Sequence, residues 1–119
     1  MNFLTRLFRR SRPQPEDEAV LVYLDGSSLP DPVYEECDLA TLEDLLGEAI
    51  DEGGLGELDG NEVGPTGVTI YLYGPDAEAL FAGVEAVLLN YPLCQNARVV
   101  IRRGGPGSSE REVRLPTKG

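Results

Sequence analysis

The order of hydrophobic patterns along the chain constrains its fold more than any other feature. Two segments, residues 42–50 and 80–88, repeat apolar side chains at helical spacing. Short runs with β-branched or aromatic residues surround them, at residues 19–24, 68–73, 98–103 and 112–115, and residues 55–63 form a weaker strand pattern. This β-α-β-β-α-β order with one added strand predicts an α+β fold. We expect a ferredoxin-like βαββαβ sandwich with an extra C-terminal strand and two helices on one face of an antiparallel sheet.

Punctuating residues set the expected ends of the two helices. Asp38 or Thr41 can cap the first helix, which residues 53–54, both glycine, should end. Pro75 is expected at the first position of the second helix, because its fixed φ suits a helix start, and Tyr91 should close that helix before Pro92.

The length and apolar content suit one core. The chain has 119 residues, of which 41% are hydrophobic. We expect a basic amphipathic N-terminal arm over residues 1–15, a ferredoxin-like domain over residues 16–115 and a tail over residues 116–119. No apolar run reaches the roughly 20 residues of a membrane-spanning helix. A cytoplasmic location is therefore expected, with the inner membrane face as a site of peripheral contact through the arm.

One segment carries a family resemblance. Residues 71–81 read Tyr-Leu-Tyr-Gly-Pro-Asp-Ala-Glu-Ala-Leu-Phe, a strand that passes through Gly-Pro into a helix. This segment resembles that of small uncharacterised bacterial proteins with a ferredoxin-like α/β domain. The resemblance implies the same fold and brings no activity with it.

The residue inventory argues against ordinary enzyme catalysis. The chain has no histidine, so neither a Ser-His nor a Cys-His pair can form, and its only lysine is Lys118. The carboxylates of the first helix fall opposite its leucines, as on a solvated face. The acidic group within residues 51–62 lacks the spacing of a calcium loop, and the glycine-rich segments 53–56 and 104–107 are typical of turns. We therefore predict a protein without catalytic residues, cofactor or metal.

The two cysteines, Cys37 and Cys94, are expected to be ordinary thiols at one rim of the sheet. Their pairing under oxidation stays an open hypothesis.

The charges are unevenly distributed. The net charge is −11, and no Lys or Arg occurs between residues 13 and 97. Such a body repels phosphate backbones, which disfavours nucleic acid as a partner.

Alternation along the strands predicts which side chains face away from the helices. That face should carry three tyrosines and two arginines, residue types that anchor protein interfaces. The partner-binding candidates on it are Tyr23, Tyr71, Tyr73, Arg98 and Arg102. Tyrosines on the first and third strands also suit stacking on single-stranded nucleic acid, which is the alternative use of this face.

A second candidate surface is the segment 26–37, expected to be an irregular loop. It places Leu29, Val33 and Tyr34 among acidic residues, and exposed apolar side chains in that setting would suit a basic protein partner. A plain spacer loop is the alternative.

The arm is the third candidate. It combines apolar with basic side chains, which suits an anionic membrane surface or the acidic body of this or a neighbouring chain. These residues are Phe3, Leu4, Leu7, Phe8, Arg6, Arg9 and Arg10.

The sequence as a whole predicts a non-catalytic interaction module that binds a protein partner or a second copy of itself, with a membrane-surface adaptor as a further alternative.

Overall fold

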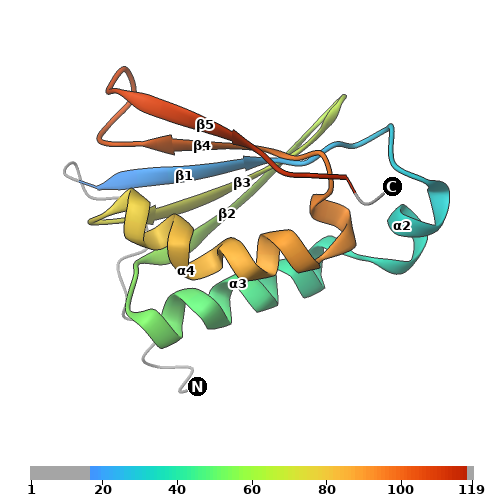
Figure 1. Ribbon diagram of the computed structural model, residues 1–119, viewed down its shortest axis with the longest axis horizontal. Coiled ribbons are helices and arrows are strands. Elements are labelled where there is room, and N and C mark those ends of the chain that lie inside the picture. The colour runs from blue at the N-terminus through green and yellow to red at the C-terminus, as the bar shows by residue number, and fades with distance from the viewer. Residues whose placement is uncertain (1–16, 118–119) are drawn as a thin grey trace.

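The computed structural model describes residues 17–117 and shows an α+β fold (Figure 1). Its antiparallel sheet has five strands in the order β2-β3-β1-β4-β5. The strands are β1 (Glu18–Tyr23), β2 (Glu57–Gly64), β3 (Gly67–Gly74), β4 (Arg98–Arg102) and β5 (Glu110–Arg114). The helices are α2 (Asp31–Glu36), α3 (Leu39–Gly53), α4 (Ala77–Asn90) and a 3₁₀ turn, η1 (Pro92–Cys94). The predicted arm lies outside the described residues.

Helices α3 and α4 lie side by side on one face of the sheet (Figure 1). Helix α3 begins where its sequence predicts, because the Asp38 side chain accepts a hydrogen bond from the Thr41 amide at 2.7 Å. It ends at Gly54, whose φ of 60° is the left-handed conformation of a helix C-cap. Its periodic side chains Leu42, Leu46 and Ile50 are buried, so the helical interpretation of this segment is confirmed.

The start of α4 differs from the expectation. The N-cap is Asp76, whose carboxylate accepts a hydrogen bond from the Ala79 amide at 3.1 Å, and Pro75 precedes the cap. An aspartate oxygen can satisfy an amide that has no partner inside the helix, and the side chain of the preceding proline offers no such acceptor. Pro75 at the first helical position was therefore wrong, whereas Tyr91 does form the C-cap.

The main core lies between the sheet and the two helices. Its strand residues lie on the side opposite the predicted tyrosine and arginine face, and α3 and α4 supply their apolar stripes. The fully buried strand residues in it are Val20, Val22, Ile70, Leu72, Val99 and Ile101.

Two features add to the expected pattern. Helix α2 occupies part of segment 26–37, so residues 17–117 form three α-helices where two were expected. Pro32 lies in its first turn, where the missing amide costs no hydrogen bond. Strand β5 begins at Glu110, two residues earlier than the sequence indicated. Among the described residues, no helix is long and apolar enough to cross a membrane.

Candidate interaction surface

The sheet face turned away from α3 and α4 brings together all five residues predicted for it. Strand pairing sets Tyr73 beside Ala19 and Ala19 beside Arg102, and it sets Tyr71 beside Leu21 and Leu21 beside Val100. A third row joins Thr69, Tyr23 and Arg98. We call this surface the open face. It consists of Ala19, Leu21, Tyr23, Thr69, Tyr71, Tyr73, Arg98, Val100 and Arg102, together with the β2 side chains that continue its rows.

The centre of the open face is apolar. Ala19, Leu21 and Val100 form a cluster of their own, with exposed fractions of 0%, 7% and 4%. Tyr23, Tyr71 and Tyr73 pack against this cluster and remain half-buried. Tyrosine rings in that position are held in place by their neighbours and still present contact area, which lowers the entropy lost on binding.

Strand β2 makes one side of the open face acidic. Pairing with β3 sets Glu57 beside Tyr73 and Glu62 beside Thr69. The Tyr71 hydroxyl donates a hydrogen bond to Oε1 of Glu62 at 3.0 Å. The pKa of Tyr71 is raised, first by this bond to the carboxylate and then by burial. Tyr71 therefore stays a neutral hydroxyl at physiological pH, and its orientation is set by Glu62.

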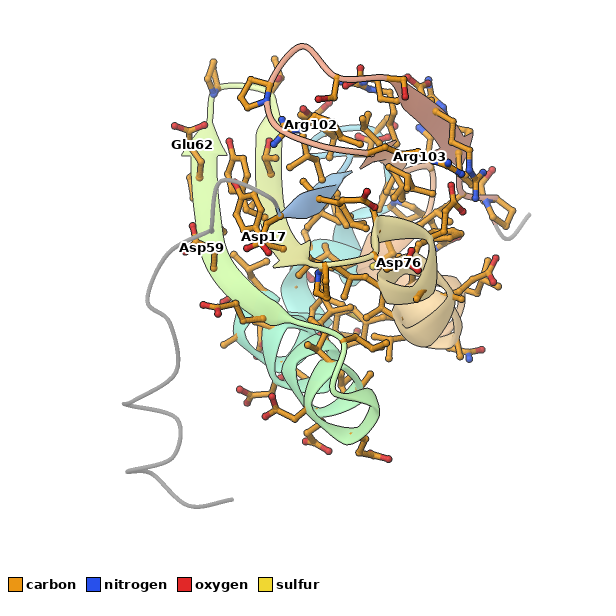
Figure 2. All side chains as sticks on the ribbon, turned by 90° about the vertical axis from the view of Figure 1, so that its left-hand side faces the viewer. Asp17, Asp59, Glu62, Asp76, Arg102 and Arg103 are labelled. Atoms are coloured by element: carbon orange, nitrogen blue, oxygen red, sulfur yellow. The ribbon has the colours of Figure 1, made fainter. Side chains whose placement is uncertain are left out.

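Charges on both sides of the open face affect the pKa of Tyr73. Burial raises the pKa of Tyr73, the nearby Asp59 carboxylate adds to that rise, and the Arg102 guanidinium opposes it. Asp59 and Glu62 lie along β2, and Arg102 lies across the face from them (Figure 2). The ring of Tyr73 is thus placed between an acidic and a basic strand.

Strand β4 makes the other side basic. The Arg98 guanidinium lies 4.1 Å from the centre of the Tyr23 ring, and its Nη1 lies 3.2 Å from Oε1 of Glu112 on β5. The Arg102 Nε donates a hydrogen bond to the Gly104 carbonyl at 2.9 Å. Both arginines are held by contacts within the chain, so their charges stay on this side of the face.

A groove of about 500 Å³ lies where the open face meets the tip of the β2–β3 hairpin, with Tyr23, Thr69 and Arg98 in its wall. Val63, which also lines it, is 73% exposed. Sequence reasoning did not select Val63. The available signal was an apolar residue directly before the predicted Gly-Pro-Thr-Gly turn, where a large exposed side chain stands out.

The second predicted surface is corrected by the structure. Leu29 is only 6% exposed, and Val33 and Tyr34 pack against the main core. The Tyr34 hydroxyl donates to the Asp25 carbonyl at 2.8 Å and accepts from the Leu29 amide at 3.1 Å. These bonds fold the segment back onto the body, so the expectation that all three apolar side chains are exposed was wrong.

The Asp25 carboxylate forms a second set of hydrogen bonds near segment 26–37. Its Oδ1 accepts the amides of Ser27 and Ser28, each at 3.0 Å, and its Oδ2 accepts Nδ2 of Asn96 at 2.7 Å as well as the Ser28 hydroxyl. These hydrogen bonds, led by those from Ser28, hold the pKa of the Asp25 carboxyl well below its usual range. We interpret this network as a structural clamp between segments 71 residues apart.

The two cysteines are free thiols that lie around Tyr91. Cys94 is fully buried and Cys37 is half-buried. Burial raises the pKa of the Cys94 thiol to about 12. Burial also raises the pKa of Tyr91, with smaller effects from Asp38 and from both thiols. A thiol as basic as Cys94 is a poor nucleophile at neutral pH.

Within residues 17–117, His, Cys, Asp and Glu side chains form no group of three or more that could hold a metal ion. The carboxylate Oε2 of Glu43, on α3, instead accepts a hydrogen bond from Asn61 at 2.7 Å.

Comparison with known proteins adds no relative. No model of a protein family matches the chain, and neither a curated protein nor a solved structure matches it. The geometry of the open face therefore carries the functional argument.

Proposed function

We propose that this protein is a non-catalytic interaction module that binds another protein, or a second copy of itself, through the open face. One observation carries the proposal: a buried apolar cluster of Ala19, Leu21 and Val100 packs against three half-buried tyrosines. None of the described helices covers this face, since α3 and α4 both pack on the opposite one. A preformed apolar centre with an aromatic and charged surround is the usual composition of a protein-binding patch.

The electrostatics favour a protein over a nucleic acid. Glu57 and Glu62 line one side of the face, and Glu112 partly neutralises Arg98 on the other. A strand of phosphates laid across the tyrosines would have to pass the acidic side at a cost that only salt reduces. The net charge of −11 adds to this repulsion.

The arrangement of the sheet supports a ferredoxin-like fold as part of the proposal. Strands β2-β3-β1-β4 form an antiparallel sheet with α3 and α4 on one face. In this interpretation α2 and β5 are additions to a βαββαβ unit. The two free thiols support a cytoplasmic location.

Site-specific crosslinking tests the proposal. A benzophenone amino acid replaces Tyr71 in the full chain and, as the control, Leu89, which is 43% exposed on α4. After irradiation in the native host, we expect a protein adduct from position 71 and none of the same mass from position 89. No protein adduct, or adducts with nucleic acid alone, would overturn the proposal.

Alanine substitutions measure how much the tyrosine side chains contribute to binding affinity. Tyr71→Ala and Tyr23→Ala should each weaken binding of the captured partner by about 10-fold or more, as expected of aromatic interface residues. Leu89→Ala should leave the affinity unchanged. Equal affinities for all three variants would place the binding site elsewhere.

A further inference from the structure

We infer that the partner of the open face is a second copy of this chain, packed face to face about a two-fold axis that runs parallel to the strands, between β3 and β1. This inference rests on the proposed function and names its partner. It depends on the order of charges across the face, which the strand register determines.

Three rows of paired residues cross the open face. The first runs Glu57, Tyr73, Ala19, Arg102, from β2 through β3 and β1 to β4. The second runs Gly60, Tyr71, Leu21, Val100. The third runs Glu62, Thr69, Tyr23, Arg98. Each outer row therefore begins with a glutamate on β2 and ends with an arginine on β4.

A two-fold axis between β3 and β1 turns each row onto itself in reverse. Glu57 then faces Arg102 of the second copy, and Glu62 faces Arg98 of the second copy. At the centre, Tyr71 lies over Leu21 of the second copy and Tyr73 lies over Ala19 of the second copy. Every charged residue of the outer rows meets its opposite, and these tyrosines meet small or apolar side chains.

Sheets that pack face to face are twisted by about 30° and lie about 10 Å apart, so individual rows shift against one another. The pairing of columns survives that twist, because the charged β2 residues on this face are all acidic and both charged β4 residues are arginines. Asp59 belongs to the same acidic column, since its charge acts on Tyr73. Complementarity therefore lies between strands and does not depend on single contacts.

Two other arrangements of two copies fail on charge. A two-fold axis perpendicular to the strands sets β2 against β2, which brings the acidic side chains of β2 against those of the second copy. Pairing along the free edge of β2 has the same fault. Like charges facing each other at an interface cost several kcal/mol. Of the face-to-face arrangements, the one with the axis along the strands pairs opposite charges.

The arginines can reach a second copy without leaving the face. The Arg98 side chain is 40% exposed, although it contacts Tyr23 and Glu112. The Glu62 carboxylate is exposed and has one oxygen engaged by Tyr71. Each can form an intermolecular hydrogen bond while keeping its existing partner, because a guanidinium has five N–H donors and an ionised carboxylate can accept several hydrogen bonds.

A charge-exchange experiment tests the inference on the full chain. The first variant carries Glu57→Arg and Glu62→Arg, so the charged residues of its outer rows are all arginines. The second carries Arg98→Glu and Arg102→Glu, so both columns are acidic. The control carries Asp44→Arg and Glu48→Arg, two exposed residues of α3. Sedimentation is measured at about 100 μM protein, well above the Kd of a specific interface, and about 150 mM salt.

The wild type and the control should sediment at twice the chain mass of 12.9 kDa. Each open-face variant alone should have a Kd raised by about 100-fold or more, because like charges then meet across the axis. An equimolar mixture of the two should form a mixed dimer with a Kd within about 10-fold of the wild type, since opposite charges meet again. A monomeric wild type, or a mixture that stays monomeric, would overturn the inference.

A second measurement does not require the charge variants to fold. Purified chain with benzophenone at position 71 is irradiated alone, and the adduct is mapped by mass spectrometry. We expect a chain-to-chain adduct within residues 19–23 of β1. An adduct elsewhere, or none, would overturn the inference. If position 71 nevertheless captures a different protein in the host, the proposed function stands and only the second copy is wrong.

One further outcome identifies a different occupant. If the full chain is monomeric and a chain lacking residues 1–15 is dimeric, the arm competes for the open face. That result would replace the second copy by the basic arm of the same chain.

Discussion

Asp25 illustrates how a single carboxylate can organise a region of this protein. It follows β1, accepts hydrogen bonds from the amides of Ser27 and Ser28, and accepts another from Asn96, two residues before β4. Asn96 has a φ of 62°, a left-handed conformation that asparagine tolerates better than most residues. These hydrogen bonds fix the backbone around Asp25, whose carbonyl accepts the hydrogen bond from the Tyr34 hydroxyl.

The lowered pKa of Asp25 predicts a pH dependence of stability. A carboxyl whose pKa is lower in the folded than in the unfolded chain stabilises the fold above its unfolded pKa of about 3.9. That contribution disappears as the pH falls toward the folded value. Asp25→Asn should be about 1–2 kcal/mol less stable at pH 6, as for a lost charge-assisted hydrogen bond, and should lose less stability than the wild type on acidification.

Urea unfolding at pH 6 and at pH 3 measures both quantities. Glu48→Gln, which removes one charge from the exposed side of α3, is the matched control and should follow the wild type. If Asp25→Asn were less stable than the wild type by the same amount at pH 6 and at pH 3, the role given to the ionised carboxylate would be contradicted.

Gly74 lies at a point of close backbone approach. A Cβ at Gly74 would lie 2.1 Å from the Leu55 carbonyl oxygen, and the two backbones leave no side chain to move aside. Gly74→Ala should destabilise the fold by about 2–3 kcal/mol, as for an overpacked core position. Gly105→Ala, where a Cβ meets open space, should stay within about 0.5 kcal/mol. Chemical denaturation of both variants checks the difference, which would vanish if the approach were loose.

The two thiols should differ in reactivity. Burial raises the pKa of Cys94 to about 12, and Cys37 is half-buried. A colorimetric thiol reagent at pH 8 should label Cys37 and leave Cys94 unreacted until the chain is denatured. Mass spectrometry of the labelled peptides gives the assignment. Rapid labelling of Cys94 in the folded protein would show that the region around Tyr91 opens readily.

At the level of elements, α3 shows how far periodicity defines a helix. Leu46 is fully buried and the adjacent Leu45 is 38% exposed, as a helix packed on one face requires. Leu46→Ala should cost about 2–5 kcal/mol, because it leaves a cavity in the core. Leu45→Ala should cost less than about 1 kcal/mol. Equal effects in thermal and urea unfolding would mean that α3 is rotated relative to the sheet.

Strand β5 depends on contacts that its own sequence does not reveal. Arg111 forms two hydrogen bonds of 2.7 Å to the Glu78 carboxylate on α4, and Arg98 on β4 reaches Glu112. Glu78 and Arg98 belong to other elements, and their contacts lie along a strand that starts at Glu110. Local β-propensity alone indicated a start two residues later.

At the level of the whole molecule, the charge distribution opposes compactness. The net charge is −11, and the chain between residues 13 and 97 has no basic side chain. Repulsion between neighbouring carboxylates is screened by salt, whose Debye length falls from roughly 30 Å at 0.01 M to about 8 Å at 0.15 M. The melting temperature should therefore rise by several degrees between these ionic strengths.

Calorimetry at the two ionic strengths measures this rise. A variant with Asp44→Lys and Glu48→Lys, which lowers the net negative charge by four, should show a smaller increase. A melting temperature independent of salt in both proteins would indicate that the acidic groups lie too far apart to interact.

The sequence by itself determined the α+β class, the extent of α3, most of α4 and the two faces of the central strands. These features follow from local periodicity, because each side chain's direction is set by its own helix or strand. Tyr23, Tyr71, Tyr73, Arg98 and Arg102 were placed on one face for that reason, and the structure brings them together there.

Only the tertiary structure decided how strands align and which loops fold back. The register that sets Glu62 beside Thr69 and Arg98 beside Tyr23 depends on backbone pairing between distant segments. The burial of Leu29 depends on a Tyr34 hydroxyl that reaches Asp25. Such contacts are made between residues that local pattern treats separately, so the charge order across the open face could not be predicted from the sequence.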